Sequence, residues 1–218
     1  MKTRPMMTAV LAGAAMFGAV RAQPAPALAA PAGPLLAIDL PQTATTKSLT
    51  VRSPTLGPGG MIPLANSGYG ASTSPALSWS KGPKGTLSFA LIMEDAGAQR
   101  AHMPILHWVV VTVVGDRTEL PAGLPPQVAL TNPDLIVQGM NIRGKPGYAG
   151  PHPPVGAGAH PYHFEVFALN TVLQPTAGAS RLAMLSAMAG HVLAKGEVVG
   201  YFAAPTPAPA PPPPVAKP

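Results

Sequence analysis

Two histidines, one tyrosine and one aspartate lie at the ends of apolar stretches, where polar side chains can do chemistry beside a core. These are His107, His160, Tyr162 and Asp95. Imidazoles donate hydrogen bonds to anions, change charge near neutral pH and bind metals. A phenol is a neutral hydrogen-bond donor. A carboxylate can orient an imidazole or accept a hydrogen bond from an ammonium group. At the mouth of a core, such groups avoid the cost of full burial. Anion binding, metal binding and hydrolysis are therefore the chemistries to compare.

The sequence favours binding over metal chemistry or hydrolysis. Two imidazoles and a carboxylate form a common metal-ligand set, but no closely spaced His-x-x-x-His pair supports a metal site. Cysteine is absent, which excludes thiolate ligands and thiol chemistry. Ser72, Ser74 and Ser78 are nearby nucleophile candidates, but no Gly-x-Ser-x-Gly turn is present. We therefore predict no metal, no cofactor and no catalytic residue, and keep hydrolysis as the weaker alternative.

Alternating apolar residues predict the strands that hold these side chains. The clearest runs are Leu87–Met93, Ile105–Val113 and Tyr162–Leu169. Because side chains alternate between the faces of a strand, His107 should share a face with Val109 and Val111, and His160 should share one with Tyr162. Short strands separated by Gly/Pro turns are typical of a β-sandwich. The sequence thus predicts a mainly β fold of two antiparallel sheets with Greek-key-like connections.

One segment near the end of the chain has helical periodicity instead. Apolar residues of Arg181–Lys195 fall on one helical face, and Ser180 is placed to cap the first turn. We therefore predict one late α-helix at the periphery of the sheets.

The two ends of the chain differ in composition from the middle. Residues 1–22 resemble a secretory signal peptide, with Lys2 and Arg4 before a short apolar run and a small-residue cleavage site; an uncleaved membrane anchor is the alternative. Residues 23–34 and 203–218 are Ala/Pro-rich and Pro-rich, and we predict that both are disordered. This leaves residues 35–202 as one folded domain in a periplasmic or secreted protein.

The charge balance argues against a nucleic-acid partner. The formal net charge is +6, and removing Lys2, Arg4 and Arg21 leaves 11 basic and 8 acidic residues. This small excess is scattered, whereas nucleic-acid-binding proteins cluster Lys and Arg among aromatic residues.

Eight short motifs, in order along the chain, carry a resemblance to a known family. They are Ser74–Trp79, Glu94-Asp95, His107–Val110, Gln138–Asn141, Gly147–Pro154, His160–Tyr162, Gly190–Lys195 and Glu197–Tyr201. In this order and spacing, over about residues 36–202, the chain resembles the phosphatidylethanolamine-binding family, in its bacterial Raf-kinase-inhibitor-like branch.

The resemblance implies two antiparallel sheets and a small cavity that accepts phosphate-like anions or phosphorylated head groups. The residues implied to line it are Asp95, His107, Gly150, Pro151, Pro153, His160 and Tyr162. The expected function is non-catalytic binding of such a ligand in the bacterial envelope. The alternative is inhibition of an envelope protease or another partner protein. Peripheral membrane contact and a dimeric state stay open.

Two departures from the family pattern affect the expected cavity. The family's Asp-Pro-Asp-x-Pro stretch is here Asp95–Gln99, without the second acid or either proline, so we expect a looser loop. The usual His-Arg pair is here His160-Pro161, which removes a cation. Losing both charges together leaves neither one unpaired.

Overall fold

The computed structural model describes residues 35–100, 102–114, 116–131, 135–174 and 179–206. The predicted signal peptide, the Ala/Pro segment at 23–34 and most of the Pro-rich tail lie outside this part of the chain. Within the described residues, no helix is both long enough and apolar enough to cross a membrane.

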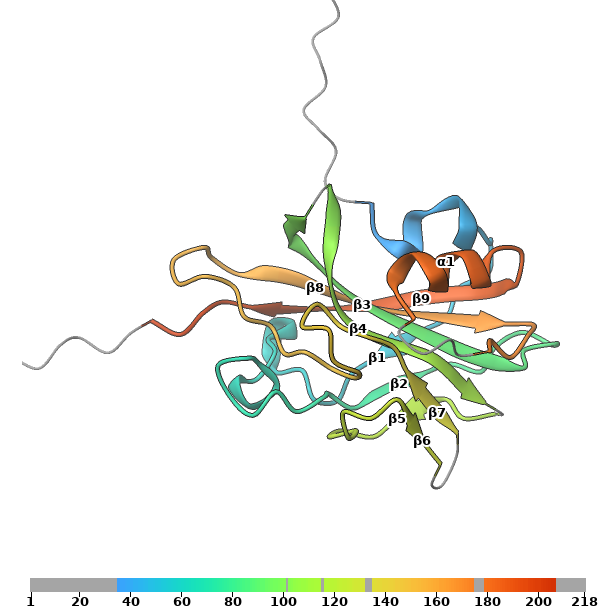
Figure 1. Cartoon of the computed structure of the whole chain (residues 1–218), viewed down its shortest axis with the longest axis horizontal. Helices are drawn as coiled ribbons and strands as arrows, with labels where there is room; N and C mark the ends of the chain where they lie inside the picture. Colours follow the sequence, from blue (N-terminus) through green and yellow to red (C-terminus); the bar gives the residue numbers. More distant parts are fainter. Residues whose placement is uncertain (1–34, 101, 115, 132–134, 175–178, 207–218) are drawn as a thin grey trace, which may run out of the picture. The chain divides into compact units, whose positions relative to one another are not determined.

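Two antiparallel sheets and one α-helix form the domain, as predicted (Figure 1). The large sheet has the order β6-β7-β4-β3-β8-β9 and the small sheet the order β1-β2-β5. The large sheet consists of β3 (Ser88–Arg100), β4 (Met103–Val114), β6 (Ala129–Leu130), β7 (Ile136–Gln138), β8 (His160–Leu169) and β9 (Val192–Phe202). The small sheet consists of β1 (Val51–Arg52), β2 (Leu77–Trp79) and β5 (Glu119–Leu120). The long strands β3, β4 and β8 are neighbours, so side chains at one end of them can converge.

Each face of the large sheet carries its own apolar cluster. The cluster between the two sheets joins Phe89, Leu91 and Met93 of β3 to residues of the small sheet such as Leu77 and Trp79. The cluster on the opposite face is covered by helix α1 (Arg181–Met188) and by an N-terminal segment with two 3-10 turns, η1 (Ala37–Asp39) and η2 (Pro41–Thr43). Figure 1 shows α1 beside these blue N-terminal turns. Two faces buried in this way explain the apolar runs along β4 and β8.

The predicted facing of β8 is confirmed, whereas that of His107 on β4 is wrong. Residue Met93 pairs with Trp108, but the next pair joins Glu94 to Leu106, so β4 has one extra residue, His107, at this point. Such a bulge reverses the alternation on its far side. The His107 ring therefore packs edge-on against Tyr162, with 5.2 Å between ring centroids, instead of sharing a face with Val109 and Val111.

The late helix is confirmed but is shorter than predicted. Ser180 caps α1, its hydroxyl accepting from the Ala183 amide at 3.3 Å. The helix ends at Met188, and Gly190 adopts a left-handed φ of 78°, which favours glycine. The residues from Val192 onward pair with β8 as strand β9, because their backbone groups find ladder partners there.

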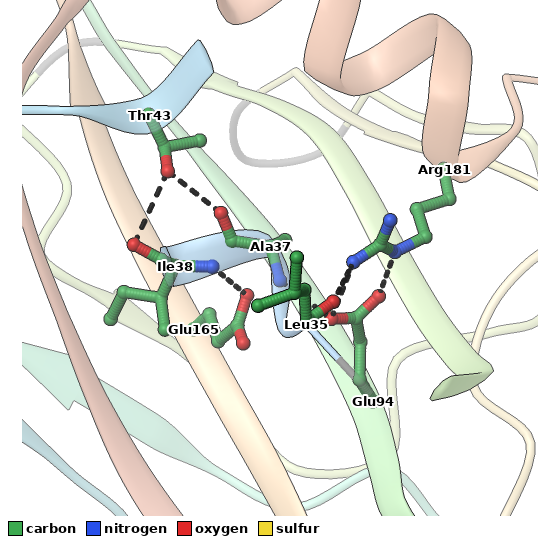
Figure 2. A network of polar contacts seen from close by, with 7 residues as sticks. All are labelled: Leu35, Ala37, Ile38, Thr43, Glu94, Glu165 and Arg181. Carbon is green, nitrogen blue, oxygen red and sulfur yellow. Dashed lines mark hydrogen bonds and ion pairs between the residues drawn. The ribbon is translucent and has the colours of Figure 1, made fainter. Parts of the chain in front are cut away.

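A polar network between the sheet and the N-terminal segment holds that segment in place (Figure 2). The buried Glu94 carboxylate accepts from the Ala37 amide at 2.8 Å and pairs with the Arg181 guanidinium. Arg181 also donates to the Leu35 carbonyl at 2.7 Å. One ion pair thus joins β3, helix α1 and the start of the folded domain.

A second buried acid extends this network. Glu165 on β8 accepts from the Ile38 amide at 3.0 Å through one oxygen, while its other oxygen has no hydrogen bond within the described residues. Burial raises the pKa of this carboxyl group well above its usual value, and the negative charge of Glu94 adds to the shift. The neutral acid is therefore favoured at Glu165, which avoids placing two buried anions side by side.

Candidate functional site

A cavity of about 220 Å³ opens at one end of the large sheet. Its walls come from β3, β4, the start of β8 and the loop that precedes β8. The lining residues are Asp95, Ala98, Ile105, His107, Ile142, Arg143, Gly150, His152, Pro153, Pro154 and His160. Five of the seven predicted site residues are thus brought together; Pro151 and Tyr162 lie outside the lining.

Asp95 fixes one imidazole and closes its own loop. Its Oδ2 lies 3.0 Å from Nδ1 of His160, and its Oδ1 accepts from the amides of Gly97 at 2.8 Å and Ala98 at 3.2 Å. Because the carboxylate is the acceptor, Nδ1 of His160 carries the hydrogen, which leaves Nε2 for a ligand. The Ala-Gly-Ala sequence after Asp95 therefore forms a hydrogen-bonded turn, although two family prolines are missing.

The second imidazole is fixed by the backbone. Nδ1 of His107 lies 2.7 Å from the carbonyl oxygen of Ala149, which can only accept, so this nitrogen also carries the hydrogen. Burial lowers the pKa of His107, and this effect outweighs the opposing ones of the Ala149 carbonyl and Asp95. Near neutral pH the His107 ring is therefore uncharged and presents Nε2 as an acceptor.

The Tyr162 ring packs against both imidazoles on the side away from the cavity. It stacks beside His160 at 6.4 Å between centroids and meets the edge of His107 at 5.2 Å. The side chain is completely buried, and its hydroxyl lies beside the Asp95 carboxylate. Burial raises the pKa of Tyr162, and the nearby Asp95 charge raises it further, so the phenol stays neutral. Its position is that of a packing residue.

The 147–153 loop brings backbone close to the cavity. The amide of Gly150 donates to the Ser72 hydroxyl at 2.7 Å. A Cβ at this glycine would lie 2.5 Å from the Ser67 backbone, so only glycine allows this approach. Pro151 is buried behind it, and its carbonyl accepts from Gly68 at 2.7 Å.

Six residues of the lining were not among the seven predicted site residues, and two of these six, Arg143 and His152, have polar side chains that can contact a ligand. Arg143 follows the Gln138–Asn141 motif by two residues, and its amide donates to the Asn141 side chain at 2.9 Å. His152 stacks on Tyr69 with 4.0 Å between centroids. Both lie in loops without periodicity; the only sequence signal for Arg143 is a basic residue close to a recognised motif. Arg143 adds a guanidinium to the lining, and its positive charge contributes to the lowered pKa of His107.

The described residues contain no group of three or more His, Asp or Glu side chains placed to hold a metal ion. At the cavity, Asp95 uses its carboxylate on His160 and on its own loop. The arrangement therefore offers fixed imidazoles and one guanidinium, which are groups that recognise anions.

Comparisons with known proteins agree with this architecture. Residues 52–203 match the family model described as phosphatidylethanolamine-binding protein. A UPF0098 protein of Methanothermobacter thermautotrophicus is 40% identical over 143 residues, which cover 66% of this chain and 91% of that protein.

Two crystal structures are similar in fold. A phosphatidylethanolamine-binding protein homologue from Chlamydia trachomatis has a TM-score of 0.63 and 30% identity, covering 73% of this chain and 100% of that one. The E. coli protein YbcL has a TM-score of 0.65 and 28% identity, covering 72% and 99%. The chain therefore belongs to the phosphatidylethanolamine-binding protein family.

Proposed function

We propose that the cavity binds a small oxyanion, such as phosphate or the phosphorylated head group of a larger molecule, without chemical conversion. The observation that carries this proposal is the fixing of both imidazoles through Nδ1, to Asp95 and to the Ala149 carbonyl. Each ring then has Nε2 left to meet a ligand. Pre-oriented groups lose little freedom on binding, which favours a small ligand.

A partly protonated oxyanion complements this set of groups best. The neutral His107 accepts through Nε2, so it pairs with a hydroxyl of the ligand, whereas the Arg143 guanidinium donates to charged oxygens. Phosphate monoesters carry such a hydroxyl over part of the neutral range, because their second pKa is about 6. A cavity of about 220 Å³ suits a head group and not a whole lipid.

We also propose that the protein acts in the cell envelope, as a periplasmic or secreted binding protein. Support comes from the signal-like composition of residues 1–22. The name of the matching family, phosphatidylethanolamine-binding protein, supports a phosphorylated head group as the ligand.

Phosphate affinity should increase as pH falls from 8 to about 5.5. Burial lowers the pKa of the free His107, and a bound anion raises it. Binding is thus linked to proton uptake, and the gain in affinity extends below the ordinary histidine pKa of about 6.5. Calorimetric titration with phosphate across this range measures the effect. Sulfate, which stays fully ionised, isolates the contribution of the protein, and a sulfate affinity independent of pH would remove the imidazoles from the binding site.

Gly97→Ala should weaken phosphate binding about tenfold by displacing His160. A Cβ at this position would lie 2.6 Å from Cγ of His160, so the ring must move away from Asp95. Losing one well-placed charged hydrogen bond costs about 1.5–3 kcal/mol. Gly57→Ala is the matched control, because its Cβ has its nearest contact at 3.6 Å. Wild-type affinity in Gly97→Ala would show that the orientation of His160 is irrelevant to binding.

A further inference from the structure

A second, larger cavity of about 650 Å³ shares two walls with the anion cavity. The shared residues are Ile105 and Ile142, so the two hollows lie on either side of the same side chains. The lining of the larger one, here called the apolar groove, consists of Arg100, Met103, Pro104, Ile105, Leu106, Met140, Asn141, Ile142, Gly144, Ser180, Arg181 and Leu182. Its volume falls in the range of about 300–1,000 Å³ that is usual for ligand pockets.

The groove exposes apolar side chains that a soluble domain would normally cover. Leu182 is 72% exposed, Met103 52% and Ile142 41%. These side chains come from helix α1, from the start of β4 and from the loop after β7, so the exposure is contiguous and not scattered. Contiguous exposed apolar surface of this kind marks a binding site more often than single exposed residues do.

The polar side chains of the groove are mostly engaged elsewhere. Asn141 donates to the Gly147 carbonyl and accepts from the Arg143 amide. Ser180 caps helix α1, and Arg181 is paired with Glu94 and Leu35. Apart from Arg100, little remains in these side chains to hydrogen-bond a polypeptide backbone. An occupant without polar groups, which means a hydrocarbon chain, fits such a surface best.

We propose that the apolar groove holds the single alkyl chain of an anionic amphiphile whose head group occupies the neighbouring cavity. The proposal rests on the anion-binding function proposed above and specifies its ligand class. The chain leaves the head-group cavity across Ile105 and Ile142, the two residues common to both hollows. Arg100 and Arg143, one in each lining, match the negative charge of the ligand. Among the residues that the structure describes, no acidic side chain lines the groove itself.

Monoalkyl phosphates of increasing length test this directly. Methyl, butyl, hexyl and octyl phosphate, each below its micelle-forming concentration, are titrated calorimetrically against inorganic phosphate as reference. A fully buried methylene contributes about 0.8 kcal/mol, or roughly fourfold in affinity, so each methylene lying in an open groove should strengthen binding about two- to fourfold. Equal affinities from methyl to octyl phosphate would overturn the proposal. Failure of inorganic phosphate itself to bind would instead overturn the proposed function.

Variants of the groove locate the chain. Met103→Ser combined with Leu182→Ser should abolish most of the gain with chain length and leave the affinity for inorganic phosphate unchanged. Both side chains are largely exposed, so neither change empties the core. Leu64→Ser, at 54% exposure and outside both linings, is the matched control and should keep the gain. A gain that survives the double variant would place the chain elsewhere. If affinity does not change with chain length and the protein forms a dimer that Leu182→Ser dissociates, the groove is instead a contact surface for a second copy of this chain.

Discussion

His107→Ala and His160→Ala should each weaken phosphate binding at pH 6 by about tenfold or more. Hydrogen bonds to charged partners contribute about 1.5–3 kcal/mol, and each variant removes the ring nitrogen that faces the ligand. The two should differ in their pH dependence. His107→Ala removes the imidazole whose pKa burial lowers, so the part of the pH dependence that comes from His107 should be lost in this variant and kept in His160→Ala. Calorimetric titrations at several pH values separate the two variants.

His163→Ala is the control for this pair. His163 lies on the same strand with opposite facing, and its Nδ1 is 2.8 Å from the Glu197 carboxylate, outside the cavity. Its removal should leave phosphate affinity within about twofold, since an exposed pair of this kind contributes less than about 1 kcal/mol even to stability. If all three variants bind phosphate equally well, the anion is not in this cavity.

The sequence predicted the facing of side chains where strands are regular and failed where pairing changes. On β8 the alternation runs unbroken from His160 to Val166, and the structure follows it. On β4 the same reasoning misplaced His107, because a bulge arises from the pairing with β3 and leaves no mark in the periodicity of β4 itself. The helix prediction failed similarly after Gly190, where hydrogen-bond partners on β8 outweigh an apolar pattern compatible with a helix.

The candidate site shows the same division between strand and loop. Asp95, His107 and His160 converge because they lie at one end of three neighbouring strands, and a motif-based prediction finds such residues well. Tyr162 shares their motif, yet the close packing of the core places it behind the rings. Arg143 was missed because the position of a loop residue depends on turns such as the one that Asn141 stabilises, and no periodic pattern reports it.

Arg181→Met should lower the free energy of unfolding by about 3–5 kcal/mol, a large effect for one side chain at the edge of the fold. The change leaves the Glu94 carboxylate buried without its cation, which is the situation that makes broken buried ion pairs costly. For a domain of this size the melting temperature should fall by roughly 10 °C, at about 2–4 °C per kcal/mol. Denaturant unfolding followed by circular dichroism measures the difference, and Arg52→Met, at an exposed position on β1, should change it little.

The double variant Glu94→Gln/Arg181→Met distinguishes the buried charge from the lost contacts of the arginine. Glutamine keeps an oxygen that can accept from the Ala37 amide, but it needs no cation, so most of the lost stability should return. Hydrogen exchange adds a local measurement. In Arg181→Met the amides of Ala37 and Ile38 should exchange faster than those of β3 and β8, because Arg181 also holds the Leu35 carbonyl. If the double variant is no more stable than Arg181→Met, the buried carboxylate is not the source of the lost stability. The loss would then come from the packing of the arginine side chain between α1 and the N-terminal segment.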